Sequence, residues 1–331
     1  MKVVRGGLLT TIQDLGRRGF QQYGVGRGGA MDRFALRVAN RLVGNPAGSA
    51  ALEITLTGPS LEFERESVIA ICGGDLPPAL GSDVLPSWRP VRVSKGSTLT
   101  FGACVGGCRA YLAVAGGIDV PEVLESRSTH LRAHFGGLDG RALHSGDTLA
   151  AGRPSETASR LLQRLGSPAP WSTVPWSLSS SMLPRYQARA FVRAIRGEAF
   201  DRLAREDQQQ VFEATFTITR ESDRMGYRTA GPALRLVEPV EQVSEPVCPG
   251  TVQLPPEGRP VVLMADCQTT GGYPRIAHVI SADLPVLAQL KPGDTFRFRQ
   301  VTLDEAQDIV LKAEREWREL EAGIERQLER L

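Results

Sequence analysis

The sequence contains no run of about 18 consecutive apolar residues, the length that a helix needs to cross a membrane, so we predict no transmembrane segment. Residues 1–9 have a charged start but lack the apolar core of a secretory signal, so we expect no such signal. Cysteine is also scarce. The five cysteines are irregularly spaced, which is typical of reduced thiols and predicts a cytoplasmic location.

An excess of either charge is missing as well. The chain has 39 Lys and Arg residues against 37 Asp and Glu residues, and its formal net charge is +2. Because the two signs are evenly mixed, we expect neither nucleic acid nor a membrane surface as a partner. The sequence also lacks the motifs G-x-x-x-x-G-K-[ST], G-x-S-x-G and H-E-x-x-H. Any ATP chemistry therefore has no recognisable phosphate loop in this chain.

Glycine and proline are plentiful, with 35 and 22 residues, and most helix-like patterns are short. This composition favours strands joined by turns, and 331 residues suffice for two domains. Residues 151–176 are rich in Ser, Pro, Arg and Ala and are predicted to be an interdomain linker. We predict a mainly β protein with one domain at 1–150, a second at 177–300 and a C-terminal helix at 301–331.

The two halves share short motifs in the same order. The pairs are Gln13-Asp-Leu-Gly-Arg with Ser222-Asp-Arg-Met-Gly, Gly58-Pro-Ser-Leu with Gly231-Pro-Ala-Leu, and Lys95-Gly-Ser with Lys291-Pro-Gly. Although short Gly-Pro turns also recur by chance, the shared order predicts two related, mostly antiparallel β-barrels.

Residues 302–331 are predicted to form one long helix. Thr302 and Glu305 make a capping box at its start. Apolar residues follow at spacings of three and four: Leu303, Ala306, Val310, Ala313, Trp317, Leu320 and Ile324. A helix of about 45 Å is longer than one small barrel needs. We expect it either to pack across its own two domains or to contact a partner chain.

The strongest candidate site is residues 265–275, which follow the apolar run 261–264. A buried strand would deliver a carboxylate, an amide and two hydroxyls to its exit, from Asp266, Gln268, Thr269 and Thr270. Gly271 and Gly272 can adopt positive φ and present backbone N–H groups to a small ligand. The competing interpretation is a tight hairpin whose polar side chains satisfy only their own backbone.

Other polar turns supply weaker candidates for the same site. These are Gln13, Asp14, Asp75, Arg127, Asp223 and Arg224. Acidic groups in such turns can orient an amide or lactam while backbone N–H groups stabilise an oxyanion. Arg127 either holds an anionic group or makes a surface ion pair.

Three other patterns compete with these turns. Gly24-Val-Gly-Arg-Gly-Gly matches G-x-G-x-x-G before a predicted helix that Asp32 caps, but no buried strand precedes it and consecutive strands follow it, which disfavours a dinucleotide fold. Zinc-type ligands are present in Cys104, Cys108, His130 and His134, but their spacing is looser than that of zinc fingers, and we predict no metal site. Cys267 and His278 offer a nucleophile and a base, although a histidine on the next strand need not face the cysteine.

Seven segments are specific enough to compare with known families. They are Gln13-Asp-Leu-Gly-Arg-Arg-Gly, Gly28-Gly-Ala-Met-Asp, Tyr111-Leu-Ala-Val-Ala-Gly-Gly-Ile-Asp, Ser126-Arg-Ser-Thr, Ser222-Asp-Arg-Met-Gly-Tyr-Arg, Gly250-Thr-Val-Gln-Leu-Pro and Gln268-Thr-Thr-Gly-Gly-Tyr-Pro. In this order, they resemble the KipA family, which comprises the C subunits of 5-oxoprolinase (PxpC). The family is also called allophanate hydrolase subunit 2, and it is similar to biotin-dependent carboxyltransferases.

The resemblance implies two cyclophilin-like β-barrels and a heteromeric complex with two further proteins, a KipI-type B subunit and an A subunit. That complex opens 5-oxo-L-proline to L-glutamate and uses ATP. The resemblance also extends to the carboxyltransferase region of urea carboxylase, in which carboxybiotin passes its carboxyl group to urea. Both reactions act on a small amide.

The resulting hypothesis is the C subunit of an ATP-dependent 5-oxoprolinase, an amide or lactam hydrolase that is inactive as a single chain. It assigns catalytic contacts to Asp266, Gln268, Thr269 and Thr270, and substrate contacts to Gly271, Gly272, Tyr273 and the weaker candidates named above. One alternative is a carboxyltransferase component that depends on biotin. Another is a non-enzymatic regulator that binds a KipI-type kinase inhibitor.

Overall fold

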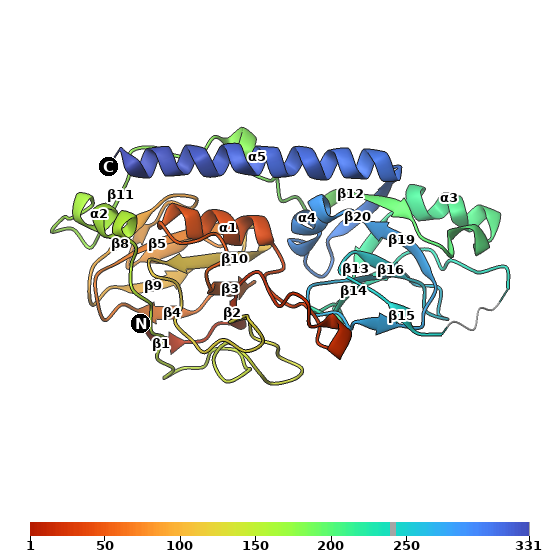
Figure 1. The fold of residues 1–331 in the computed structure, drawn as a ribbon, viewed down its shortest axis with the longest axis horizontal. Coiled ribbons are helices and arrows are strands. Elements are labelled where there is room, and N and C mark those ends of the chain that lie inside the picture. The colour runs from red at the N-terminus through yellow and green to blue at the C-terminus, as the bar shows by residue number, and fades with distance from the viewer. Residues whose placement is uncertain (239–242, 331) are drawn as a thin grey trace. The chain divides into compact units, whose positions relative to one another are not determined.

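The computed structural model describes residues 1–238 and 243–330, and they form two compact units that are interleaved in sequence. The first unit comprises Met1–Arg17, Asp32–Pro184 and Glu316–Leu331, of which Leu331 lies outside the described residues. The second comprises Arg18–Met31 and Arg185–Arg315. The predicted mainly β fold with a long C-terminal helix is confirmed (Figure 1).

The first unit holds two antiparallel sheets around one apolar core. Its strands are β1 (Lys2–Arg5), β2 (Leu9–Gln13), β3 (Ala51–Thr55), β4 (Ser60–Glu62), β5 (Ser67–Asp75), β6 (Pro78–Leu80), β7 (Asp83–Val84), β8 (Val91–Val93), β9 (Thr98–Phe101), β10 (Gly106–Val114) and β11 (Trp171–Thr173). The sheet orders are β1-β4-β9-β6-β7 and β11-β8-β5-β10-β3-β2. Ile54 and Leu112 of one sheet and Leu61 and Leu99 of the other are fully buried in the shared core.

Helix α1 (Arg33–Leu42) packs on β5 and β10 of the first unit. Asp32 precedes it, as predicted, and its Oδ1 accepts a hydrogen bond from Ala35 N at 3.0 Å. This N-cap satisfies one of the N–H groups that a helix start leaves unpaired. Leu36 and Ala39 are fully buried. The spacing of the apolar residues therefore determines which face of α1 packs on the sheet.

Residues 151–176 are not an extended linker. They contain helix α2 (Glu156–Arg164), whose N-cap Ser155 accepts from Ala158 N at 3.1 Å. They also contain β11, which extends a sheet by pairing Trp171 with Val93 of β8. The Ser, Pro, Arg and Ala composition concealed a capped helix that needs only two buried apolar residues, one of them Leu161.

The second unit is a closed barrel. Its strands are β12 (Arg189–Arg196), β13 (Phe216–Ile218), β14 (Gly226–Ala230), β16 (Thr251–Gln253), β17 (Val261–Leu263), β19 (Arg275–Val279) and β20 (Thr295–Gln300). They close in the order β12-β19-β16-β17-β14-β13-β20, and the parallel pairing of β12 with β20 completes the barrel. A separate two-stranded sheet joins β15 (Glu245–Pro246) to β18 (Thr270–Gly271).

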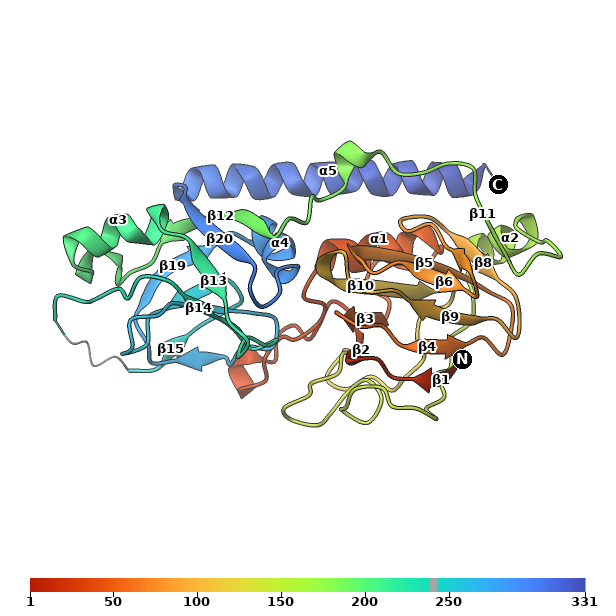
Figure 2. The same ribbon diagram turned by 180° about the vertical axis from the view of Figure 1, so that it is seen from behind.

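Short helices surround this barrel. They are α3 (Arg205–Glu213) and α4 (Leu284–Ala288), with 3₁₀ turns at Gln21–Tyr23, Phe200–Arg202 and Ser281–Asp283; a further turn, Ser180–Met182, belongs to the first unit. Helix α3 packs against β20 (Figure 2). The interior is aromatic, since Phe216, Phe296 and Phe298 contact one another with ring centroids 5.0–5.9 Å apart.

Helix α5 (Leu303–Glu329) contributes its first half to the second unit and its second half to the first. The predicted capping box is confirmed, because Thr302 N donates to Glu305 Oε2 at 2.7 Å and Glu305 N donates to Thr302 Oγ1 at 3.2 Å. Of the predicted apolar stripe, Ala306, Trp317, Leu320 and Ile324 are buried, whereas Leu303, Val310 and Ala313 are exposed. Each half therefore packs on the unit to which it belongs. Within the described part of the chain, no helix is both long and apolar enough to cross a membrane.

The anchor of the second half is Trp317, which is 3 % exposed. Its ring meets Phe34 edge-on at a centroid distance of 6.2 Å, and the Arg37 guanidinium lies 3.9 Å above it. We expect Trp317→Ala to lower the free energy of unfolding by about 3–5 kcal/mol, through lost burial and a cavity. Urea denaturation would measure this loss.

The matched control is Leu311→Ala on the same helix, at a side chain that is 55 % exposed. We expect it to change stability by no more than about 0.5 kcal/mol. Equal losses in the two variants would contradict the assignment of Trp317 as the anchor.

Candidate functional site

The candidate turn begins where β17 ends, and backbone hydrogen bonds fix it to the loop that precedes β14. Met264 N donates to Met225 O at 3.0 Å, and Asp266 N donates to Arg224 O at 2.8 Å. These bonds extend the pairing of β14 with β17 beyond the ends of the strands. Backbone hydrogen bonds alone therefore hold the base of the turn in place.

Arg224 and Asp266 form a buried, bidentate ion pair at this base. Arg224 Nε donates to Asp266 Oδ2 at 2.8 Å, and its Nη2 donates to Asp266 Oδ1 at 2.9 Å. The two side chains are only 5 % and 6 % exposed. A carboxylate that is buried and held at both oxygens by a guanidinium is a positioning group, because little of it is accessible to a ligand.

The glycine-rich segment that matches G-x-G-x-x-G packs against this pair. Arg224 Nη2 donates to Gly29 O at 2.6 Å, and Gly28 N donates to Ala265 O at 3.0 Å. A Cβ at Gly26 would lie only 2.8 Å from Cys267 O. These glycines permit two backbones to approach each other, and a 3₁₀ turn rather than a strand precedes them.

The far side of the turn exposes its polar side chains. Thr269 O accepts from Val247 N at 3.0 Å, and Thr270 pairs with Pro246 in the small sheet. Gln268, Thr270 and Tyr273 are exposed to solvent, and Tyr273 is 48 % exposed. The hydroxyl and amide groups predicted from the sequence are therefore presented on one short segment.

Gln253 of β16 is a candidate residue that the sequence patterns did not identify. It is only 2 % exposed, and its Nε2 makes no hydrogen bond. Its Oε1 lies 3.5 Å from Gln268 Nε2, the limit of a hydrogen bond. A buried amide with an unpaired N–H₂ group is costly in a folded protein, which distinguishes Gln253 from the other residues of β16.

The role of Gly271 differs from the predicted one. Neither Gly271 nor Gly272, both among the described residues, has a positive φ. A Cβ at Gly271 would instead lie 2.4 Å from Gln253 Nε2. Glycine is needed here because the Gln253 amide occupies the space where a side chain would begin.

Asp223 makes a local turn and does not reach the ion pair. Its Oδ1 accepts from Met225 N at 2.8 Å and Gly226 N at 3.2 Å, and the residue is exposed. Its neighbour Arg224 is thereby directed inward.

The candidates of the first unit form a separate group around Asp14. Its Oδ1 accepts from Gly16 N at 2.7 Å and from Ser128 Oγ at 2.5 Å, and its Oδ2 accepts from Arg127 N at 2.6 Å. Ser126 Oγ also donates to Oδ1, at 2.7 Å. Four donors on one carboxylate make Asp14 the organiser of the loop 126–128.

The remaining first-unit candidates have distinct surroundings. Gln13 is buried, and its Nε2 donates to Thr129 O at 3.2 Å while its Oε1 makes no hydrogen bond. Arg127 pairs with Glu122 at 2.9 Å and lines a hollow of about 560 Å³. Asp75 is exposed at the end of β5. The structure thus joins Asp14 to Arg127, and Arg224 to Asp266, within their respective units.

The surroundings of Cys267 and His278 do not favour the alternative in which they act as nucleophile and base. Burial raises the pKa of the Cys267 thiol to about 12, so it stays protonated and weakly nucleophilic. Burial lowers the pKa of His278, whose Nδ1 lies 3.4 Å from Thr251 Oγ1. The His130 ring stacks on Phe135. Among the described residues, no group of three or more His, Cys, Asp or Glu side chains could hold a metal ion.

The second-unit arrangement is therefore a hydrogen-bonding surface built on a buried ion pair. It offers the side-chain amide of Gln268 and the hydroxyls of Thr269 and Thr270, and the buried Gln253 amide lies next to Gln268. Such groups can bind both the N–H and the C=O of a small amide.

Comparisons with known proteins place these features in context. Residues 23–300 match the family described as carboxyltransferase domain, subdomain A and B. The chain is 41 % identical over 310 residues to the C subunit of 5-oxoprolinase from Escherichia coli, covering 92 % of this chain and 93 % of the relative. It is 38 % identical over 305 residues to the protein of the same name from Haemophilus influenzae, covering 92 % of each.

Among solved structures, the Kluyveromyces lactis urea carboxylase is similar with a TM-score of 0.87 and 33 % identity. The match covers 98 % of this chain but 29 % of that one. The related fold is thus one part of a longer polypeptide there.

The close approach at Gly26 generates a stability prediction. We expect Gly26→Ala to cost about 1–3 kcal/mol, because the new Cβ would force the 265–267 backbone to shift. Chemical denaturation of the intact chain would measure the loss.

Gly323→Ala is the matched control, since no heavy atom lies within 4 Å of the position that its Cβ would take in α5. We expect it to stabilise the chain by about 1 kcal/mol, because alanine favours a helix more than glycine does. The same substitution should therefore act with opposite sign at the two positions. A Gly26→Ala chain as stable as the original would contradict the contact.

The ion pair generates a second prediction. Arg224→Met leaves the Asp266 carboxylate buried without its partner and should cost about 3–5 kcal/mol. The double variant Arg224→Met/Asp266→Leu removes both charges and should recover much of that loss. A double-mutant cycle by denaturation would measure the coupling. Strict additivity of the two single losses would show that the pair is not coupled.

Proposed function

This chain belongs to the carboxyltransferase domain family, subdomains A and B, and from that membership we propose that it is the C subunit of an ATP-dependent 5-oxoprolinase. The observation that carries the proposal is the 41 % identity to a 5-oxoprolinase C subunit, extending over 93 % of that relative. In the proposed reaction, the lactam of 5-oxo-L-proline is opened by water to L-glutamate and ATP is consumed. The enzyme is cytoplasmic.

The geometry of the candidate turn supports an amide substrate. A lactam presents one N–H donor and one C=O acceptor, and the Gln268 side chain offers a partner for each. The buried Gln253 amide, whose Oε1 lies 3.5 Å from Gln268 Nε2, helps to position the Gln268 side chain. Thr269, Thr270 and the backbone N–H group of Gly272 stabilise the oxyanion that forms when water attacks, whereas Gly271 pairs with Glu245 in the small sheet.

Asp266 and Arg224 act as positioning residues in this proposal. Both Asp266 oxygens accept from Arg224 and the carboxylate is buried, so it fixes the turn and does not contact the substrate. Replacing Asp266 alone would strand the buried Arg224 charge. Loss of activity in that variant would therefore reflect folding as much as chemistry.

ATP binding is assigned to no residue of this chain. The glycine-rich segment at 24–29 packs on the 265–267 backbone and is not arranged as a phosphate loop. The proposal therefore includes two further proteins, a KipI-type B subunit and an A subunit, and the chain is inactive without them. The name of the relatives, which designates one of several subunits, supports this dependence.

The second candidate function is carboxyl transfer in a biotin-dependent, urea-type carboxylase. The TM-score of 0.87 to a urea carboxylase favours it. Biotin would then be carried by a separate protein, and the same amide-binding turn would hold urea. The third candidate, a regulator that binds a KipI-type kinase inhibitor, would keep its partner but would not need the polar turn.

Glutamate formation from 5-oxoproline and ATP tests the proposal. We expect product only when this chain and both partner subunits are present. In the assembled enzyme, Gln268→Ala should lower kcat/KM at least about tenfold, because hydrogen bonds to the substrate amide are lost.

Gln209→Ala is the control, since Gln209 is an exposed glutamine on α3 and should leave the rate unchanged. Full activity of Gln268→Ala would contradict the assigned site. The absence of glutamate from every mixture would contradict the proposed reaction, and carboxyl transfer to urea would then be assayed.

A further inference from the structure

The strands that close the barrel of the second unit carry a basic and aromatic surface. β12 and β20 pair in parallel, so that Phe191 lies opposite Arg297 and Arg193 lies opposite Arg299. Side chains alternate across a strand, and these residues therefore share the outer face of the barrel. Their neighbours on the inner face are buried in the core: Val192, Ala194, Phe296 and Phe298.

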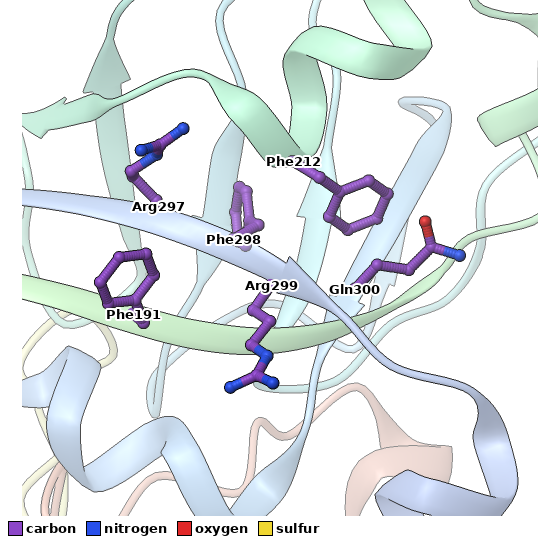
Figure 3. Close-up of a pocket in the computed structure, with 6 residues that line it drawn as sticks. All are labelled: Phe191, Phe212, Arg297, Phe298, Arg299 and Gln300. Carbon is purple, nitrogen blue, oxygen red and sulfur yellow. The ribbon is translucent and has the colours of Figure 1, made fainter.

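Two adjoining hollows lie on this outer face and share Phe191 and Arg299. The first has a volume of about 490 Å³ and is lined by Phe191, Phe212, Arg297, Phe298, Arg299 and Gln300 (Figure 3). The second has a volume of about 420 Å³, and its charged lining comprises Arg185, Arg189, Arg193, Asp283 and Arg299. We call the combined surface the β12–β20 face.

Positive charge dominates the β12–β20 face, with five guanidinium groups against one carboxylate. That carboxylate, Asp283, accepts from Arg193 Nε at 2.9 Å and from Arg193 Nη2 at 2.5 Å, so it neutralises one arginine only. Within the described part of the chain, Arg185 and Arg189 make no ion pair, and Arg299 makes none within 4.0 Å, although its charge, after hydrogen bonds from Thr302, helps to lower the pKa of Glu305. A chain with a net charge of only +2 thus concentrates unpaired cations at one place.

Phe191 sits among these cations with 68 % of its surface exposed. Covering an exposed phenylalanine with apolar atoms is favourable, because it removes apolar surface from water. Arginine and aromatic residues are also the types that dominate binding at protein interfaces. The combination favours a protein partner that brings both carboxylates and an apolar pocket.

The number of arginines favours an occupant with several acidic groups. Arg189 and Arg193 are four residues apart on one strand, which places their Cα atoms about 13 Å apart. Arg185 and Arg299 line the same hollow, whereas Arg193 is already paired with Asp283. Several carboxylates can each pair with a different guanidinium group on such a surface.

The closed barrel also limits how a partner can bind. Since every strand of the barrel pairs on both sides, no strand edge of this barrel is available for an added strand in the residues that the structure describes. Recognition must use side chains on the outer face.

We propose that the β12–β20 face binds an acidic segment of one of the partner subunits. Carboxylates of that segment pair with Arg185, Arg189 and Arg299, and an apolar pocket between them receives Phe191. The inference rests on the proposed function, because it takes the partner from the same 5-oxoprolinase assembly. In the urea carboxylase relative, the matched region is 29 % of the chain, so further protein accompanies this fold there as well.

The test measures binding of the full chain to the A and B subunits by calorimetry, separately from activity. The variant Arg189→Glu/Arg299→Glu should weaken binding to one of them at least about 100-fold, because carboxylates would then face carboxylates. Phe191→Ala should weaken it at least about tenfold. Binding of the unchanged chain should fall as salt is raised to about 0.3 M, and the double variant should lose that dependence.

The control is Arg160→Glu/Arg259→Glu, which alters two exposed arginines outside the face and changes the net charge equally. It should bind within about threefold of the unchanged chain, as expected for charges at a distance. Equal weakening in both double variants, unaltered binding of Arg189→Glu/Arg299→Glu, or failure of the unchanged chain to bind either partner would overturn the inference. A salt-sensitive complex that forms no glutamate would instead refute the proposed reaction and support partner binding at the β12–β20 face.

Discussion

The ion pair between Arg224 and Asp266 is the interaction on which the candidate site depends. It joins three segments that are far apart in sequence, because Arg224 also donates to Gly29 O and the 265–267 backbone receives the glycine-rich segment. A buried pair of this kind is tolerated only when both charges are matched, so the three segments are held in one arrangement. The exposed amide and hydroxyl groups of Gln268 and Thr270 therefore project from a fixed base. Pre-organisation of this sort is what a site that stabilises a transition state requires.

The first unit contains a similar arrangement of an aspartate turn and a buried arginine. Asp14 accepts from the N–H two residues later, as Asp223 does, and each aspartate is followed by a buried arginine. Arg17 is fully buried, donates to Ser128 O and lies 4.6 Å from the centre of the Phe135 ring. The motif similarity between the halves thus corresponds to a shared structural role, in which an arginine ties loops to the end of a strand. The two halves differ in the groups that contact this arginine: Ser128 O and the Phe135 ring for Arg17, and Asp266 and Gly29 O for Arg224.

The sequence predicted the elements better than their assembly. The strands, the helix that Asp32 caps and the long helix with its capping box follow from local apolar periods and cap residues, and these are properties of neighbouring residues. The helix and strand within 151–176 were missed, because their apolar content is small. The attachment of residues 18–31 to the second unit could not be predicted, since nothing in that segment specifies which surface it covers. Gln253 was also missed, because nothing in its sequence neighbourhood distinguishes it from other strand residues. Only the three-dimensional packing shows that its amide is buried and that its Nε2 makes no hydrogen bond.

The interleaving of the two units bears on how the chain reaches its folded state. Residues 316–330 complete the core of the first unit, and Trp317 packs on Phe34 of the helix that Asp32 caps. During synthesis α5 leaves the ribosome after every other element of the two units, so the first unit, whose strands emerge earliest, also waits longest for its final contacts. Contacts with such large sequence separation form slowly and leave apolar surface uncovered in the meantime. The side of α1 that carries Phe34 therefore stays uncovered on the nascent chain until α5 has emerged.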